Sequence, residues 1–330
     1  MIAHVDYVTD PEVSADPIGF VLDALGQPGS LLLLGLGLVV VLLALLAWAR
    51  WRPLENARLR LIERTDAYHE YLPWIVRLSV GLVLIGSGLS RLQFLPTLPA
   101  EGIAALALTA TGFLLLLGLA VRPAALVALA LYVITLAGNP ELVMMLDVAG
   151  GLSVAAIVGP GRPSVDDLLR AAFPRGPGAR AATANLARAR YDDTVPLLVR
   201  LGLGGAFAAS GIIDKLLIHE QALAAVDKYA LTSVVPVSAE LWVLGAILIE
   251  TALGIAIILG LLTRFSAVVG FAVLTLALFA LPDDPVIAHV GLFGLSSMLV
   301  ILGGGRWSVD RMLLAPLGER LQVKKPVVRV

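Results

Sequence analysis

Long apolar segments recur along the chain, separated by short loops that carry the prolines and most of the charges. Nine of these segments have about 16 to 24 residues, which suits a helix that crosses roughly 30 Å of hydrocarbon. Because backbone polar groups in lipid must be satisfied within a segment, we predict helices rather than strands. The segments lie at residues 30–49, 72–90, 102–120, 123–138, 141–158, 195–213, 239–262, 265–281 and 286–303.

The composition agrees with a protein that lies in lipid. With 58% hydrophobic and 15% charged residues, the 330-residue chain has too little polar surface to coat a soluble globule. The chain has no cysteine, which excludes disulfides, thiolate metal ligands and iron–sulfur ligation by this polypeptide. The net charge of -1 does not favour nucleic acid as a partner. The lipid bilayer is therefore the expected partner.

The two halves of the chain carry the same residues at matching places. In the first helix of each half, the residues recur 123 positions apart, as Arg77, Leu78, Gly81, Ser87 and Gly88 and then as Arg200, Leu201, Gly204, Ser210 and Gly211. The end of each half also recurs, as Gly159, Gly161, Arg162, Ser164, Val165 and Asp166 and then as Gly303, Gly305, Arg306, Ser308, Val309 and Asp310. The sequence therefore predicts a duplicated four-helix module.

The predicted fold is an all-α polytopic membrane protein with nine spans, made of two parallel four-helix bundles and one N-terminal transmembrane helix. Residues 1–71 hold an acidic outer N-terminus, the accessory helix and a basic cytoplasmic linker. The modules are 72–170 and 195–315, joined by an Arg-rich cytoplasmic linker at 171–194 and followed by a basic tail at 316–330. An insertion in the second module, at about 217–237, is expected to form a helix on the outer surface.

Lysine and arginine favour one orientation. If the N-terminus lies outside, nearly all basic loops are cytoplasmic and only Arg91, Lys215 and Lys228 remain outside. We therefore predict a multi-pass protein of the cell membrane with a cytoplasmic C-terminus. Each module has an even number of helices, so both modules should insert in the same direction.

Three motifs in the second half resemble the DoxX/DoxD superfamily of four-helix membrane proteins. They are Arg-Leu-x-x-Gly at Arg200, Glu250 followed by Gly-Leu-x-x-Arg at Gly260, and Gly-x-Gly-Arg-x-Ser-x-Asp at Gly303. The resemblance implies association with membrane redox systems, including quinone-linked oxidoreductases. The family usually has Lys three residues after the glycine that ends the first helix, whereas here Asp214 stands there and Lys215 follows.

Glu250 is the leading candidate for a functional residue, because it lies near the middle of an apolar segment. A carboxylate at that depth costs several kcal/mol unless it is protonated, paired or in contact with water. Its counterpart in the first half is Leu108. It either handles a proton in a ligand pocket or is a neutral acid hydrogen-bonded to Ser210, Ser296 or a carbonyl.

A polar rim is expected above Glu250, formed by the outward ends of neighbouring helices. No helix carries metal ligands at i and i+4, so we predict no metal site and either a titrating rim at the pocket mouth or a solvated helix edge. The predicted ligand-binding or pocket-rim residues are Asp214, Lys215, His219, Glu240, His289 and Ser210.

An arginine near the start and an aspartate near the end of each module recur together. We predict a structural clasp that joins the first helix to the last, in which the arginine fork binds the carboxylate. The pairs are Arg77 with Asp166 and Arg200 with Asp310. Asp147, which has no repeat partner, is expected to reach the surface.

The predicted function is a redox-associated membrane subunit whose second module holds a pocket for a quinone or another lipophilic ligand. No intrinsic cofactor is expected, so electron transfer requires a partner redox protein. A non-enzymatic transporter, a cargo-binding scaffold and a structural assembly subunit stay open as alternatives. Whether the chain is itself an enzyme and how it oligomerises are left open.

Overall fold

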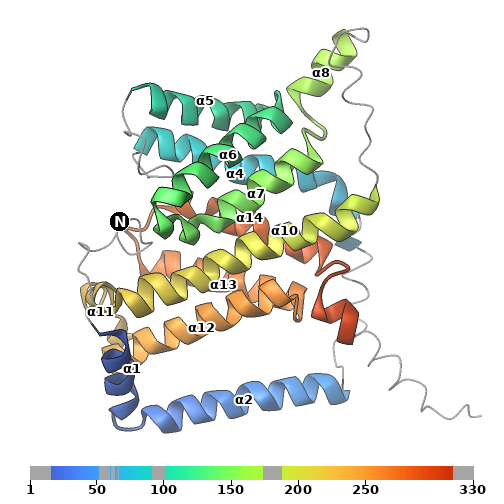
Figure 1. The fold of residues 1–330 in the computed structure, drawn as a ribbon. Helices are drawn as coiled ribbons and strands as arrows, with labels where there is room; N and C mark the ends of the chain where they lie inside the picture. Colours follow the sequence, from blue (N-terminus) through green and yellow to red (C-terminus); the bar gives the residue numbers. More distant parts are fainter. Residues whose placement is uncertain are drawn as a thin grey trace, which may run out of the picture.

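A computed structural model describes residues 16–51, 60, 64–65, 67–90, 102–173 and 188–314, and all regular structure in these ranges is helical (Figure 1). The all-α prediction is therefore confirmed. The predicted outer N-terminus at 1–15, the central part of the Arg-rich linker at 174–187 and the tail at 316–330 lie outside the described residues.

The helices of the first half follow the predicted apolar segments closely. Short 3₁₀ turns, η2 (Ala67–Tyr71) and η3 (Pro140–Met145), extend two of the helices at their N-termini. The helices are α1 (Pro17–Gly26), α2 (Ser30–Trp51), α4 (Leu72–Ser90), α5 (Ile103–Leu117), α6 (Val121–Gly138), α7 (Leu146–Val158) and α8 (Val165–Ala172).

The second half repeats this order with one addition. A π-helical segment, η4 (Ser210–Leu217), continues α10, and the predicted outer helix is α11, followed by the 3₁₀ turn η5 (Leu231–Ser233). A second π-helical turn, η6 (Asp310–Leu314), follows the last long helix. The helices are α10 (Arg188–Ala209), α11 (His219–Lys228), α12 (Ala239–Leu259), α13 (Thr263–Ala280) and α14 (Val286–Leu302).

Several of these helices are long and apolar enough to cross a membrane. The described residues contain six such helices, or seven if α1 and α2, which meet at 88°, count as one broken span. The apolar helices α5 and α14 are shorter, at 15 and 17 residues. The chain is thus a multi-pass membrane protein.

The first and last long helices of both halves share one core. Helix α7 lies along α10, and α14 lies along α4, while α5 covers α4 and α12 covers α10 (Figure 1). One continuous cluster of buried side chains joins both halves, with Leu84 of α4, Leu152 of α7, Leu203 of α10 and Leu295 of α14 among its members. The two bundles predicted to stand side by side thus interlock, because each half packs its last helix on the first helix of the other.

Small residues make this interlocking close. A Cβ atom added to Gly150 of α7 would lie 2.8 Å from the Cα atom of Gly202 on α10. The positions that match these two by the 144- and 123-residue offsets are Gly294 and Ser79, and they also meet, with Gly294 against the Ser79 hydroxyl. Small side chains let helix backbones approach in lipid, where no hydrophobic drive brings them together.

Contacts inside the halves match in the same way. Gly81 of α4 faces the Gly112 carbonyl, and Gly204 of α10 faces the Gly254 carbonyl. A Cβ atom at these two positions would lie 3.0 Å and 2.6 Å from the facing oxygen. The close approach of the first and second helices is thus made by corresponding glycines in both halves.

Candidate functional site

Lys215 and Glu250 form an ion pair in the second half of the chain. Glu250 lies near the centre of α12, and its Oε2 atom is 2.8 Å from Nζ of Lys215. Each side chain is 17% exposed, so the pair is largely shielded from surrounding solvent and lipid. Lys215, predicted to lie on a rim above Glu250, is instead its direct partner, and this pairing lowers the cost of a charge in a membrane helix.

The π-helical segment η4 directs this lysine inward. Its i→i+5 hydrogen bonding fits one more residue into a turn than an α-helix does. Lys215 stands four residues after Gly211, one position later than the lysine of the DoxX/DoxD pattern described above. The wider turn accommodates this one additional residue. Nζ of Lys215 also donates to Oγ of Ser210 over 3.1 Å, and Ser210 donates to Oδ2 of the fully buried Asp214 over 3.3 Å. Ser210, Asp214, Lys215 and Glu250 are hereafter called the ion-pair cluster.

A second buried pair lies beside this cluster, where α13 turns into α14. Oδ2 of Asp284 is 3.3 Å from Nε2 of His289, and their side chains are 4% and 5% exposed. Burial raises the pKa of the Asp284 carboxyl to about 7, while nearby Lys215 opposes that shift and Asp214 adds to it. His289 was among the predicted residues, but Asp284 was not singled out.

The neighbouring Asp283 has the opposite surroundings. Its exposed carboxylate accepts hydrogen bonds from Nζ of Lys228 over 2.9 Å and from the hydroxyl of Tyr229 over 2.7 Å. The bond from Lys228 and then the bond from Tyr229 hold the pKa of Asp283 below its usual value. Two adjacent aspartates thus lie in contrasting environments, and nothing in the sequence separates them.

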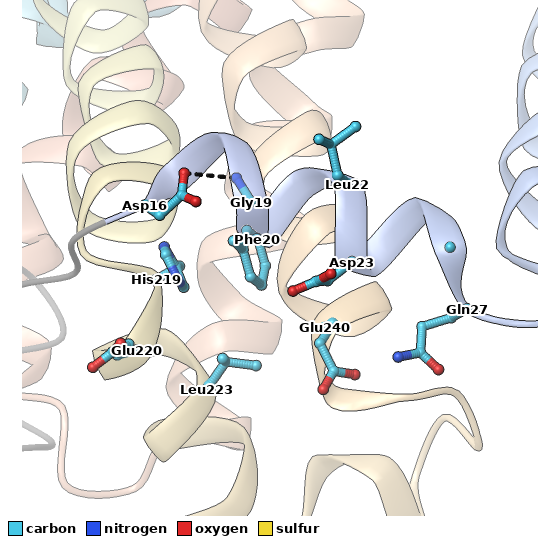
Figure 2. Close-up of a pocket in the computed structure, with 11 residues that line it drawn as sticks. Asp16, Gly19, Phe20, Leu22, Asp23, Gln27, His219, Glu220, Leu223 and Glu240 are labelled. Atoms are coloured by element: carbon cyan, nitrogen blue, oxygen red, sulfur yellow. Dashed lines mark hydrogen bonds between the residues drawn. The ribbon is translucent and has the colours of Figure 1, made fainter.

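His219 and Glu240, the other predicted rim residues, lie at a separate place. They line an open cavity of about 710 Å³ between α1, α11 and the start of α12 (Figure 2). Phe20 of α1 stacks on the His219 ring, with centroids 4.3 Å apart, and Asp23 of α1 and Glu240 of α12 also line the cavity. The sequence indicated no contact between the N-terminal segment and the second module, so this cavity was not predicted.

The predicted Arg–Asp clasp takes a different form. The Arg77 guanidinium donates to the carbonyls of Leu115, Leu116, Pro160 and Pro163, and Arg200 donates to the carbonyl of Trp307. The aspartates accept from the backbone at the start of the third helix of each half, Asp166 from Ala120 and Asp310 from Leu262 and Thr263. The arginine and the aspartate of each half therefore do not form the predicted bidentate ion pair. Each of them instead joins helix ends by hydrogen bonds to backbone carbonyls or amides.

Asp147 is buried rather than at the surface. Its side chain is inserted between α7 and α14, where its carboxylate lies against Gly291. Gly291 corresponds to Asp147 by the 144-residue offset, so only a residue without a side chain leaves room for the carboxylate. The expectation that Asp147 reaches the surface is wrong because the interlocking of the halves covers it.

Two hydroxyl groups in the second half bear on ligand binding. Oγ1 of Thr251, which lies against Gly211, is buried and has no hydrogen-bond partner among the described residues, and the same holds for Oγ of Ser296. In the first half, the corresponding Thr109 donates to the Ala105 carbonyl over 2.8 Å. The hydroxyl of Thr251 thus differs from that of Thr109 in having no hydrogen-bond partner among the described residues. Over the described ranges, no group of three or more His, Asp or Glu side chains is arranged to hold a metal ion.

Comparison with known proteins gives one match. The sequence model of the DoxX family matches residues 195–283, from the membrane part of α10 to the turn after α13. This range contains the whole ion-pair cluster, together with His219 and Glu240. No curated protein and no solved structure matches the chain.

Proposed function

We propose, on the premise that residues 195–283 form a DoxX family domain, that the chain is a membrane subunit associated with a quinone-linked redox system. The observation that carries the proposal is the Lys215–Glu250 ion pair, because it places a carboxylate at the centre of the membrane helix α12 and its counter-charge on η4, both inside the matched domain. Ionisable residues at such depth commonly serve ion or proton pathways and ligand binding.

The topology belongs to the same proposal. Nine spans result if α2, α5 and α14 cross the bilayer with the six longer helices, as two modules of equal orientation and an accessory helix. The matched glycine contacts of the two halves support this duplication. The short helices α5 and α14 cover roughly 22 to 26 Å at 1.5 Å per residue, which a locally thinned bilayer accommodates. The basic loops favour an outer N-terminus and a cytoplasmic C-terminus in the cell membrane.

Glu250 is the group that handles a proton in this proposal. When Glu250 is a carboxylate, it accepts a hydrogen bond from the Lys215 ammonium. When Glu250 is protonated, the Lys215 ammonium can donate that hydrogen bond to another acceptor. Lys215 and Thr251 would orient a quinone headgroup by donating to its carbonyl oxygens. A bound quinone supplies two-electron, two-proton redox chemistry. The electrons come from a partner protein, since the chain has no cysteine with which to hold an iron–sulfur cluster.

The open cavity beside α1 favours a second candidate, a scaffold or transporter that binds a solute or a client protein. Its lining is rich in carboxylates, and none of its residues belongs to the ion-pair cluster; the acidic ones are Asp16, Asp23, Glu220 and Glu240. Binding there would use charge at the surface rather than a proton at the centre of the membrane.

Extraction into mild detergent, followed by chromatography and mass spectrometry of the bound lipids, tests the first candidate. We expect a quinone to co-purify with the wild-type protein and to be lost at least about tenfold from Glu250→Gln, which keeps the size of the side chain but removes its charge. Glu250→Leu, which copies Leu108, should behave in the same way. Glu240→Gln is the matched control in the same helix. Equal quinone in all four proteins, or none in the wild type, would contradict the proposal.

A further inference from the structure

The two ring nitrogens of His289 have different partners. Nδ1 lies 3.3 Å from the Pro285 carbonyl oxygen, and Nε2 lies 3.3 Å from Oδ2 of Asp284. A carbonyl oxygen only accepts hydrogen bonds, so Nδ1 carries a proton when it makes this bond. The backbone at the start of α14 thereby selects the tautomer of the imidazole.

This tautomer leaves a question of proton count. A neutral imidazole protonated at Nδ1 has a lone pair on Nε2, and an ionised carboxylate has only lone pairs to present. Two lone pairs 3.3 Å apart in a buried site repel each other. The contact is attractive if one further proton lies between the two atoms, either on Nε2 or on Oδ2.

The other oxygen of Asp284 points to the same conclusion. Oδ1 is buried and meets no hydrogen-bond donor within the described part of the chain. A full negative charge on a buried carboxylate is costly when one oxygen lacks a donor. A proton held by the pair reduces that cost.

The surrounding groups are mostly acidic. Asp214 and Lys215 face the pair from η4, and Glu250 lies beyond Lys215 on α12. Asp147 on α7 contacts α14 at Gly291, one half-turn from His289. The carboxyl groups around the pair outnumber the one lysine among them, so a proton held by the pair reduces the net negative charge of this region. The adjacent Asp283 is exposed and is paired with Lys228 rather than with the buried pair.

We infer that Asp284 and His289 form a proton-binding pair that exchanges one proton with the outer solution beside the Lys215–Glu250 ion pair. This inference deepens the proposed function, since it assigns an entry point to the proton that Glu250 handles. A proton gained by the pair and a proton gained by Glu250 oppose each other electrostatically, because each makes the same region more positive. A proton bound at one site therefore disfavours a proton at the other.

Nitrogen-15 NMR of histidine-labelled protein in nanodiscs tests the inference. The chain has four histidines, and His289→Gln identifies the signals of interest. In the wild type we expect Nδ1 of His289 to stay protonated at every pH, while the Nε2 signal titrates as the pair loses its shared proton. Asp284→Asn should abolish that titration. Asp283→Asn, which alters the adjacent exposed carboxylate, should leave it unchanged.

Proton uptake gives an independent readout. In a pH-jump experiment with an indicator dye, Asp284→Asn and His289→Gln should each bind one proton fewer per chain than the wild type across the neutral range. A neutral His289 protonated at Nε2 in the wild type would overturn the inference without any variant. Equal titration of Asp284→Asn and Asp283→Asn would do the same.

These outcomes separate the pair from the proposed function. If the wild type carries no quinone but His289 behaves as expected, the redox role fails and the proton-binding pair stands. If quinone binding depends on Glu250 while His289 has the other tautomer, only the pair is refuted.

Discussion

Replacing Lys215 by methionine should destabilise the protein strongly, because it leaves Glu250 without its counter-charge. At the 2.8 Å separation, two unit charges attract each other by about 6 kcal/mol for an effective dielectric constant near 20. Much of this attraction is offset by desolvation, and removal of one partner from a buried pair costs about 3–5 kcal/mol. Since each side chain is 17% exposed, we expect a loss of about 3 kcal/mol in the free energy of unfolding.

A double-mutant cycle isolates the interaction. Lys215→Met combined with Glu250→Leu removes both charges, so the double variant should lie within about 1 kcal/mol of the wild type and the coupling energy should be about 2–3 kcal/mol. The assay is SDS-induced unfolding in mixed micelles, followed by circular dichroism at one pH for all the variants.

The exposed pair Lys228–Asp283 is the matched control, and its side chains are 43% and 55% exposed. Lys228→Met and Asp283→Asn should couple by less than about 1 kcal/mol. If the cycle at Lys215 and Glu250 gave an equally small value, the two charges would not depend on each other, and the reasoning on the ion pair would be refuted.

Three further predictions concern other parts of the structure. Asp310→Ala should cost about 2 kcal/mol, because it removes three hydrogen bonds at the start of α13, whereas Asp166→Ala, with one such bond, should cost about 1 kcal/mol or less in the same unfolding assay. Gly260→Ala should cost at least about 2 kcal/mol, because φ is +68° and the added methyl group meets the Arg200 guanidinium, whereas Gly245→Ala in open space within α12 should be neutral or stabilising by up to about 1 kcal/mol. The raised pKa of Asp284, about 7 against 3.8, means that the folded state keeps a proton that the unfolded chain releases, so stability should fall as pH rises from about 4 to about 7. Asp284→Asn should flatten this dependence when unfolding is measured across that range, and an unchanged slope would contradict the assignment.

The helices could be predicted from the sequence because their apolar segments are long and their loops carry proline and charge. The predicted segment 72–90 coincides with α4, and 286–303 differs from α14 by one residue. The central position of Glu250 followed from the same pattern. The packing of α14 on α4 and of α7 on α10 did not, because apolar faces in lipid carry no signal that names their partner.

Of the residues predicted for the rim and pocket, Ser210, Asp214 and Lys215 lie with Glu250, whereas His219 and Glu240 line a separate cavity. Lys215 was placed on the rim because the apolar segment stops at residue 213, whereas the π-helical turn continues the helix to Leu217. Asp284 was missed because burial, which distinguishes it from Asp283, comes from tertiary packing. The repetition of Arg77, Arg200, Asp166 and Asp310 located the joints correctly, but the atoms that bind are backbone carbonyls and amides.

The interlocking of the halves has a consequence for biogenesis. Helix α4 enters the bilayer during translation well before α14, which covers one of its sides, has left the ribosome. Until α14 is inserted, the side of α4 that it will cover faces the translocon or neighbouring lipids. A nascent chain that stops before α14 lacks the helix that covers this side of α4, so the shared core is completed only after α14 has been synthesised.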